Sequence, residues 1–142
     1  MNKTSKTPSV LFVCSKNGGK SQLAAGLMNQ LANGAVTVHS AGTSPGKSLN
    51  AQSVESLAEV GIDITGEHPK PITDDVLNAV DAIIVLGTEA KVQPPEGTRF
   101  EVWDTDEPSK RGIEGMERMR LVRDDIKARV QKLCAELSGT ST

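Results

Sequence analysis

The sequence predicts a single α/β domain with a four-stranded parallel sheet and helices on both faces. Two observations lead to this prediction. Short apolar runs that suit buried strands alternate with segments whose apolar residues recur at helical spacing. The chain also has 142 residues, which fits one domain with a single core. Alternating strands and helices give parallel strands that are joined by right-handed crossovers.

Four apolar runs are the predicted strands. The first is Ser9 to Val13, ending at Cys14, and the second covers residues 36–39 (VTVH). The third covers residues 82–86 (AIIVL), and the fourth covers residues 100–103 (FEVW). Because the runs are short and largely apolar, they suit a sheet that is covered on both faces.

Helices are predicted after the strands. Apolar residues at helical spacing indicate helices around residues 23–31 and 54–60, and each is followed by a glycine that can end it. A short helix is expected around residues 74–80. The apolar stripe from 113 to 137 predicts a long closing helix.

The polar ends of the chain frame this domain. We expect residues 1–8 to be a flexible lead-in, residues 9–138 to form the domain and residues 139–142 to be a flexible tail. The formal net charge is -2 and the chain has no run of Lys and Arg, so neither nucleic acid nor a membrane is an expected partner. The lead-in has no apolar segment long enough for a signal peptide, which predicts a cytoplasmic protein.

The stretch CSKNGGKS, residues 14–21, is the strongest functional signal. Gly18 and Gly19 can take positive φ, which lets backbone N–H groups point into the turn. The amino terminus of the following helix adds a partial positive charge, so a tetrahedral oxyanion is the expected ligand. The predicted oxyanion-binding residues are Ser15, Lys16, Asn17, Gly18, Gly19 and Lys20.

This loop could bind a nucleotide or carry a cysteine nucleophile. Residues 19–21 (GKS) look like the end of a Walker A loop, but Cys14 stands where that loop needs a glycine. The magnesium-holding acid of such proteins is expected at the end of an apolar strand, whereas Asp81 precedes the third strand. The positive field favours a thiolate at Cys14, and Ser21 is placed to donate a hydrogen bond to it. A purely structural, buried Cys14 is the third alternative.

Four features, in this order, resemble the low-molecular-weight protein tyrosine phosphatase superfamily. They are Cys14 with Lys20-Ser21 after five intervening residues, Asn17 within the loop, residues 40–43 (SAGT) and the acid–proline pair Glu107-Pro108. The resemblance covers nearly the whole chain and implies the fold of that superfamily. Within it, the sequence is most similar to the arsenate reductases, and specifically to the mycothiol-dependent branch of actinobacteria.

Departures from the superfamily distinguish its branches. Lys20 stands where the usual loop ends in arginine, and residues 17–22 (NGGKSQ) are similar to those of the mycothiol-dependent enzymes. The phosphatases carry tyrosines beside the acid–proline pair, and this chain has no tyrosine. Thioredoxin-coupled reductases have two further cysteines beyond the third strand, whereas residues 87–93 (GTEAKVQ) contain none. The resemblance therefore implies an external thiol, mycothiol, and a mycoredoxin as reducing partner.

The resemblance implies that the Cys14 thiolate attacks arsenate, with Lys20 and Ser21 as catalytic partners. The adduct would pass to mycothiol, and mycoredoxin would then release arsenite. No metal and no bound cofactor are expected, and the oligomeric state is left open. One alternative is a phosphatase that hydrolyses a Cys14 phosphoenzyme with water. Another is a non-catalytic oxyanion-binding module, because Lys20 lacks the planar fork of arginine.

The family's proton donor is the acid immediately before the proline, which is Glu107 here. Asp106 and Asp104 are near alternatives, and residues 104–107 (DTDE) could otherwise form an ordinary acidic turn.

Three residues are expected to support the loop. Asn17 and Ser40 are predicted to hydrogen-bond to each other. Some related reductases bind a monovalent cation behind the loop with a nearby carboxylate, and Lys70 takes that place here. The expectation is that the Lys70 ammonium replaces the cation and helps keep Cys14 ionised. An exposed loop lysine is the alternative.

Overall fold

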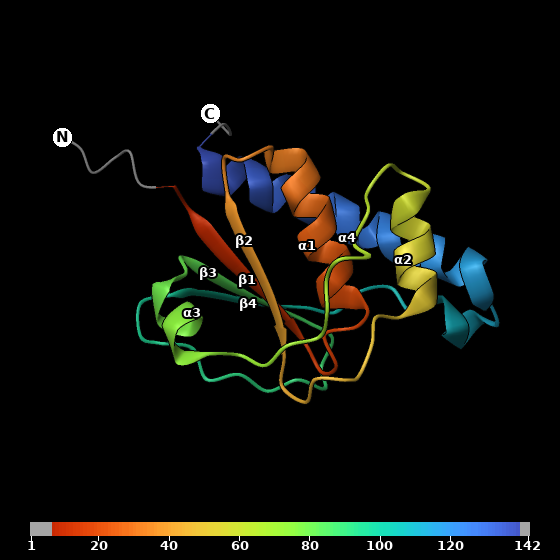
Figure 1. The fold of residues 1–142 in the computed structure, drawn as a ribbon, viewed down its shortest axis with the longest axis horizontal. Coiled ribbons are helices and arrows are strands. Elements are labelled where there is room, and N and C mark those ends of the chain that lie inside the picture. The colour runs from red at the N-terminus through yellow and green to blue at the C-terminus, as the bar shows by residue number, and fades with distance from the viewer. Residues whose placement is uncertain (1–6, 140–142) are drawn as a thin grey trace.

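The computed structural model describes residues 7–139, in which strands and helices follow the predicted order (Figure 1). The elements are β1 (Ser9–Cys14), α1 (Lys20–Ala32), β2 (Thr37–Gly42), α2 (Ala51–Ala58), α3 (Asp74–Ala79), β3 (Ala82–Leu86), β4 (Arg99–Trp103), the short 3-10 helix η2 (Pro108–Arg111) and α4 (Gly115–Ser138). The predicted flexible segments, 1–8 and 139–142, lie mostly outside the described residues and stay predictions.

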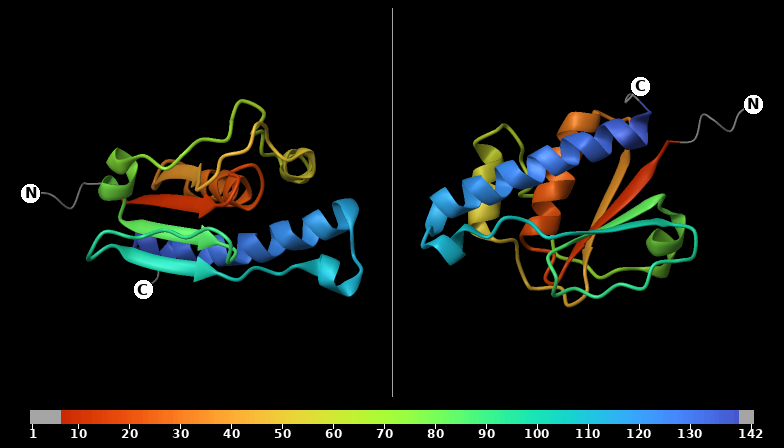
Figure 2. Two further views of the ribbon diagram at one scale, coloured as in Figure 1. Left: turned by 90° about the horizontal axis from the view of Figure 1, so that it is seen from below. Right: turned by 180° about the vertical axis from the view of Figure 1, so that it is seen from behind.

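The four strands form one parallel sheet in the order β2-β1-β3-β4. Side chains of β1 alternate between its two faces. Val10 and Phe12 join the core cluster that contains α1 and α4, while Leu11 and Val13 join the cluster against which α3 packs. Figures 1 and 2 show α4 running alongside α1, behind it in one view and in front in the reverse view. The predicted four-stranded parallel sheet with helices on both faces is confirmed.

The strands end together at one edge of the sheet, and this edge positions the site. Cys14 ends β1 and pairs with Gly42, the last residue of β2. β2 extends three residues beyond its predicted end, because residues 40–42 pair with residues 12–14 of β1. The Gly42 N–H also donates to the Lys70 carbonyl at 2.8 Å. A Cβ on Gly42 would lie 2.7 Å from the Ser15 carbonyl oxygen, so this close approach requires glycine.

The long helix α4 contributes both to the core and to the site. Its apolar side chains, among them Val122, Ile126 and Val130, are buried against α1 and the sheet. Its polar face carries Arg118 and Asp125, which contact the segment that follows β4. Within residues 7–139, no helix combines the length and the apolar character that a membrane span needs.

Candidate active site

The loop from Cys14 to Lys20, here called the anion loop, is fixed by backbone hydrogen bonds to residues 43–50. The carbonyl oxygens of residues 14, 15, 16 and 18 accept from N–H groups of that segment at 2.7–3.2 Å. In a trans peptide the carbonyl and the next N–H point in opposite directions, so the N–H groups of residues 15, 16, 17 and 19 point inward. The anion loop is therefore a nest of donors, as an oxyanion site requires.

Cys14 lies at the floor of this nest. The Ser21 hydroxyl is 2.9 Å from the Cys14 sulfur, and the Asn17 N–H donates to the same sulfur at 3.2 Å. Ser21 Oγ also accepts from Asn17 Nδ2 at 2.7 Å, which leaves the hydroxyl proton free to be donated to the sulfur. The Ser21 hydroxyl and the Asn17 N–H are therefore both placed to donate to the sulfur, and the contact expected of Ser21 is present.

The backbone of the anion loop differs from the prediction at one point. Positive φ was expected at Gly18 and Gly19, but it occurs at Asn17, where φ is 56°, and Gly19 has φ of -128°. Asparagine tolerates the left-handed region because its short polar side chain can bond locally. Gly18 is needed for another reason, since a Cβ there would lie 2.9 Å from the Ser48 carbonyl oxygen.

Lys70 connects the two predicted support residues. Its backbone N–H donates to Asn17 Oδ1 at 3.0 Å, and its ammonium donates to Ser40 Oγ at 3.1 Å. The expected direct bond between Asn17 and Ser40 is thus wrong, because Lys70 lies between them. The ammonium also contacts the His68 carbonyl at 3.4 Å and Glu67 at 3.8 Å. It has the oxygen neighbours that a bound cation would have.

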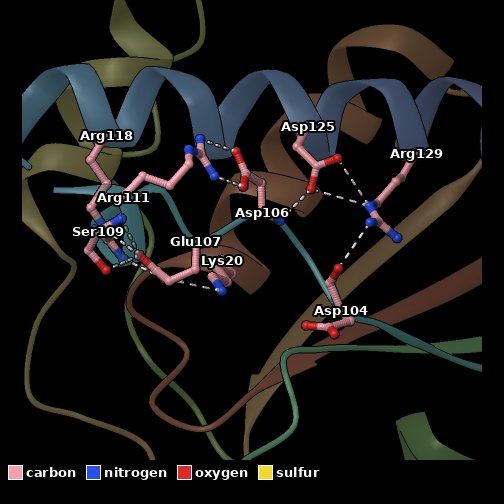
Figure 3. A network of polar contacts seen from close by, with 9 residues as sticks. All are labelled: Lys20, Asp104, Asp106, Glu107, Ser109, Arg111, Arg118, Asp125 and Arg129. Carbon is pink, nitrogen blue, oxygen red and sulfur yellow. Dashed lines mark hydrogen bonds and ion pairs between the residues drawn. The ribbon is translucent and has the colours of Figure 1, made fainter. Parts of the chain in front are cut away.

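Lys20 and Glu107 meet at the open side of the anion loop. Lys20 is the first residue of α1, and its Nζ lies 3.9 Å from Glu107 Oε1. Glu107 is more tightly held by Arg118, whose guanidinium donates to both carboxylate oxygens at 2.7 and 2.9 Å (Figure 3). Ser109 Oγ adds a third bond at 2.7 Å.

These contacts contradict the predicted role of Glu107 as proton donor. The bonds from Arg118 and, to a smaller extent, Ser109 outweigh partial burial and lower the pKa of Glu107 from 4.5 to about 2. Asp106 is paired with Arg111 at 2.8 Å, and this pairing likewise lowers the pKa of Asp106 below its ordinary value. The arginine partners therefore stabilise the charged form of both carboxyls, which lowers the fraction of each that carries a proton.

Asp104 has different surroundings. Arg129 bonds to the Asp104 carbonyl at 3.0 Å and pairs with Asp125, whereas the Asp104 carboxylate has no ion pair with any residue in the described part of the chain. Figure 3 shows this carboxylate turned away from Arg129. Of the three acids that the sequence nominated, Asp104 is the one not neutralised by an arginine.

Two site residues were not predicted. Gln22 is buried and its Nε2 donates to the Asn17 carbonyl at 3.1 Å, bracing the anion loop from α1. Arg118 comes from α4, eleven residues after Glu107. No sequence signal marks Arg118, because a single arginine on a charged helix face is ordinary. Within residues 7–139, no three His, Cys, Asp or Glu side chains gather as a metal site would require.

The sequence of this chain is similar to those of known proteins. Residues 9–141 match the model of the low molecular weight phosphotyrosine protein phosphatase family. The glutaredoxin arsenate reductase of Synechocystis sp. is 33% identical over 132 residues, which cover 91% of this chain and 98% of that protein. The arsenate reductase of Staphylococcus aureus is 32% identical over 127 residues, which cover 87% and 93% of the two chains.

A solved structure agrees with these similarities. The thioredoxin-dependent arsenate reductase of Corynebacterium glutamicum has a TM-score of 0.81 and 31% identity to this chain. The superposition covers 96% of this chain but 65% of the Corynebacterium chain, so about a third of that protein has no counterpart here.

Proposed function

Because the chain belongs to the low molecular weight phosphotyrosine protein phosphatase family, we propose that it is an arsenate reductase with Cys14 as nucleophile and an external thiol as second substrate. The observation that carries this proposal is the donor nest of the anion loop with the Cys14 sulfur at its floor. Arsenate is a tetrahedral oxyanion that fits such a nest. The similarity to proteins named arsenate reductases supports the choice of substrate.

In the first step, the Cys14 thiolate attacks arsenic while Lys20 and the loop N–H groups bind the remaining oxygens. A sulfur–arsenic bond forms, one arsenic–oxygen bond breaks and the oxygen leaves as water after accepting a proton. We assign the proton donor to Asp104, because among the acids of residues 104–107 it is the one whose carboxylate makes no ion pair with an arginine of the described residues.

In the second step, the mycothiol sulfur attacks the arsenic of the Cys14 adduct. The bond between arsenic and the Cys14 sulfur breaks, so an arsenic–mycothiol adduct leaves and Cys14 is released as a thiolate. A mycoredoxin thiolate then attacks the mycothiol sulfur, so a mixed disulfide forms and two electrons reduce arsenic to arsenite. This chemistry needs no metal and no bound cofactor from the chain, and it belongs in a reducing cytoplasm.

The position of Cys134 argues for an external thiol. Arg99, which begins β4, forms an ion pair with Glu136, so this end of α4 lies at the edge where the strands begin. Cys14 ends β1 and lies at the opposite edge. Cys134 is also partly buried against the main core. Cys134 therefore lies near the start of the strands and Cys14 at their end, so Cys134 is not placed to resolve an adduct on Cys14.

Arsenite formation from arsenate tests this proposal. Purified protein is supplied with mycothiol plus mycoredoxin, glutathione plus glutaredoxin, or thioredoxin, and p-nitrophenyl phosphate is assayed in parallel. Of these three thiol systems, we expect only mycothiol plus mycoredoxin to support turnover. Turnover with thioredoxin would contradict the proposal that a small external thiol takes arsenic from Cys14. Release of nitrophenol without any arsenite would assign the site to phosphate ester hydrolysis instead.

Removing the Lys70 ammonium tests its role behind the anion loop. The contacts that lead from Lys70 through Asn17 and Ser21 to the Cys14 sulfur start at the Lys70 backbone N–H. Lys70→Met keeps that N–H and removes the ammonium that donates to Ser40, so the variant tests the positive charge alone. We expect Lys70→Met to lower the ionised fraction of Cys14 at neutral pH, measured by the ultraviolet absorbance of the thiolate. Lys91→Met, an exposed lysine after β3, is the matched control. An identical thiolate titration in both variants would remove Lys70 from the mechanism.

A further inference from the structure

We propose that Glu107 and Arg118 are positioning residues: Arg118 fixes the Glu107 carboxylate, and the carboxylate in turn aims the Lys20 ammonium into the anion loop. The role given to Lys20 rests on the proposed function. The arrangement, here called the Lys20–Glu107–Arg118 chain, joins the amino terminus of α1 to the first turns of α4 through the residue before η2 (Figure 3).

The Arg118–Glu107 pair is the rigid part of this chain. Two parallel N–H···O bonds at 2.7 and 2.9 Å make a bidentate pair, which is stronger and more directional than a single contact. Ser109 bonds to Oε2 from η2. Both side chains are three-quarters buried, which limits screening by solvent. The carboxylate is thus held from two elements before any ligand arrives.

Lys20 is the mobile part. An ammonium is a point charge on a flexible stem, whereas the arginine usual at this position has a fixed fork. The Lys20 ammonium lies 3.9 Å from Glu107 Oε1. At this distance it is attracted to the carboxylate but does not form a hydrogen bond with it. Its protons stay available for arsenate oxygens. The fixed carboxylate therefore supplies an orientation that the lysine lacks.

Arg118 also balances the charge at the entrance. Without Arg118, the Glu107 carboxylate would pair fully with Lys20 and cancel the positive charge that Lys20 offers to the incoming anion. With Arg118 in place, the chain of three charges presents one net positive charge. Of the neighbouring acids, Asp106 is paired with Arg111, whereas Glu114 interacts with Arg118 and offsets part of its charge.

This assignment separates Glu107 from the proton-transfer step. The groups that face its carboxylate are Lys20 from α1, Arg118 from α4 and Asp106 in the same segment. The two cations outweigh the one anion, in keeping with a pKa of about 2 for Glu107. The pH dependence of turnover near neutrality is therefore set by groups other than Glu107.

The test measures anion binding without using turnover. Arsenate or phosphate bound in the anion loop protects Cys14 from alkylation by iodoacetamide, so the anion concentration for half-protection reports affinity. We expect Arg118→Met to raise this concentration about tenfold, as the loss of one charge contact of about 1.4 kcal/mol predicts. The double variant Arg118→Met/Glu107→Gln should regain most of the affinity, because it also removes the carboxylate that would otherwise pair with Lys20.

Arg120→Met is the matched control, since Arg120 lies two residues further along α4 and pairs with Glu59 instead. Thermal unfolding and the rate of Cys14 alkylation without anion check that each variant is folded. Unchanged half-protection in Arg118→Met would overturn the proposal. So would a Glu107→Gln enzyme that binds the anion normally but loses the acidic group from its pH–rate profile. Protection by phosphate tests the proposal even if no arsenite forms with any thiol.

Discussion

Replacing Cys14 by serine is expected to lower arsenite formation by at least about 10³-fold. A serine hydroxyl stays protonated at neutral pH, and the donors that surround the sulfur, Ser21 Oγ and the Asn17 N–H, are placed for an anion. Arsenate should still bind, because the loop N–H groups and Lys20 remain. The measurement is arsenite production with the full thiol system, combined with arsenate binding by calorimetry.

Cys134→Ser is the matched control for this experiment. Cys134 lies on α4 at the far edge of the sheet, so its variant should keep the activity of the parent protein. Retained activity in Cys14→Ser would contradict the nucleophile assignment. Lost activity in a folded Cys134→Ser protein would contradict the external-thiol step, since it would make Cys134 a resolving residue.

The second large effect is expected at Asp104. Asp104→Asn removes the proposed proton donor and should lower kcat about 10²-fold, the smaller end of what general acid catalysis contributes. Asp106→Asn, from the same segment, should change kcat far less, because the Asp106 carboxylate is engaged by Arg111, which stabilises its charged form. The measurement is kcat of each variant across the neutral pH range at saturating arsenate.

The two variants together decide the assignment. A large loss in Asp106→Asn with a near-normal Asp104→Asn would move the proton donor to Asp106. Near-normal kcat in both would mean that the departing oxygen takes its proton from solvent or from the substrate.

The sequence was sufficient for the strands and for the position of the anion loop. Apolar runs of four to six residues marked every strand, and the spacing of Cys14 and Lys20 around two glycines marked the anion loop. These signals come from residues that are close in sequence, so they can be recognised from the sequence alone. The end of β2 was missed because it depends on pairing with β1 and on the Lys70 carbonyl, both of which are distant in sequence.

The surroundings of Glu107 and the contacts that support the anion loop could not be predicted in the same way. Glu107 occupies the family position of the proton donor, but its neighbour Arg118 belongs to another helix and cancels that role. Asn17 and Ser40 were correctly placed near each other, yet the residue that joins them is Lys70. Charge pairs between elements decide protonation, and a sequence does not show them.

The identity of the thiol is a prediction from the sequence. The relatives carry names with glutaredoxin or thioredoxin, whereas the absence of cysteine from residues 87–93 favours a small external thiol. Mycothiol and mycoredoxin, like the cytoplasmic location, stay predictions.

The most direct test supplies arsenate and mycothiol without mycoredoxin and identifies the products by mass spectrometry. The account predicts that an arsenic–mycothiol adduct accumulates, that the protein returns with Cys14 free, and that arsenite appears after mycoredoxin is added. Arsenite formed without mycoredoxin, or a disulfide between Cys14 and Cys134, would contradict the transfer of arsenic from Cys14 to an external thiol.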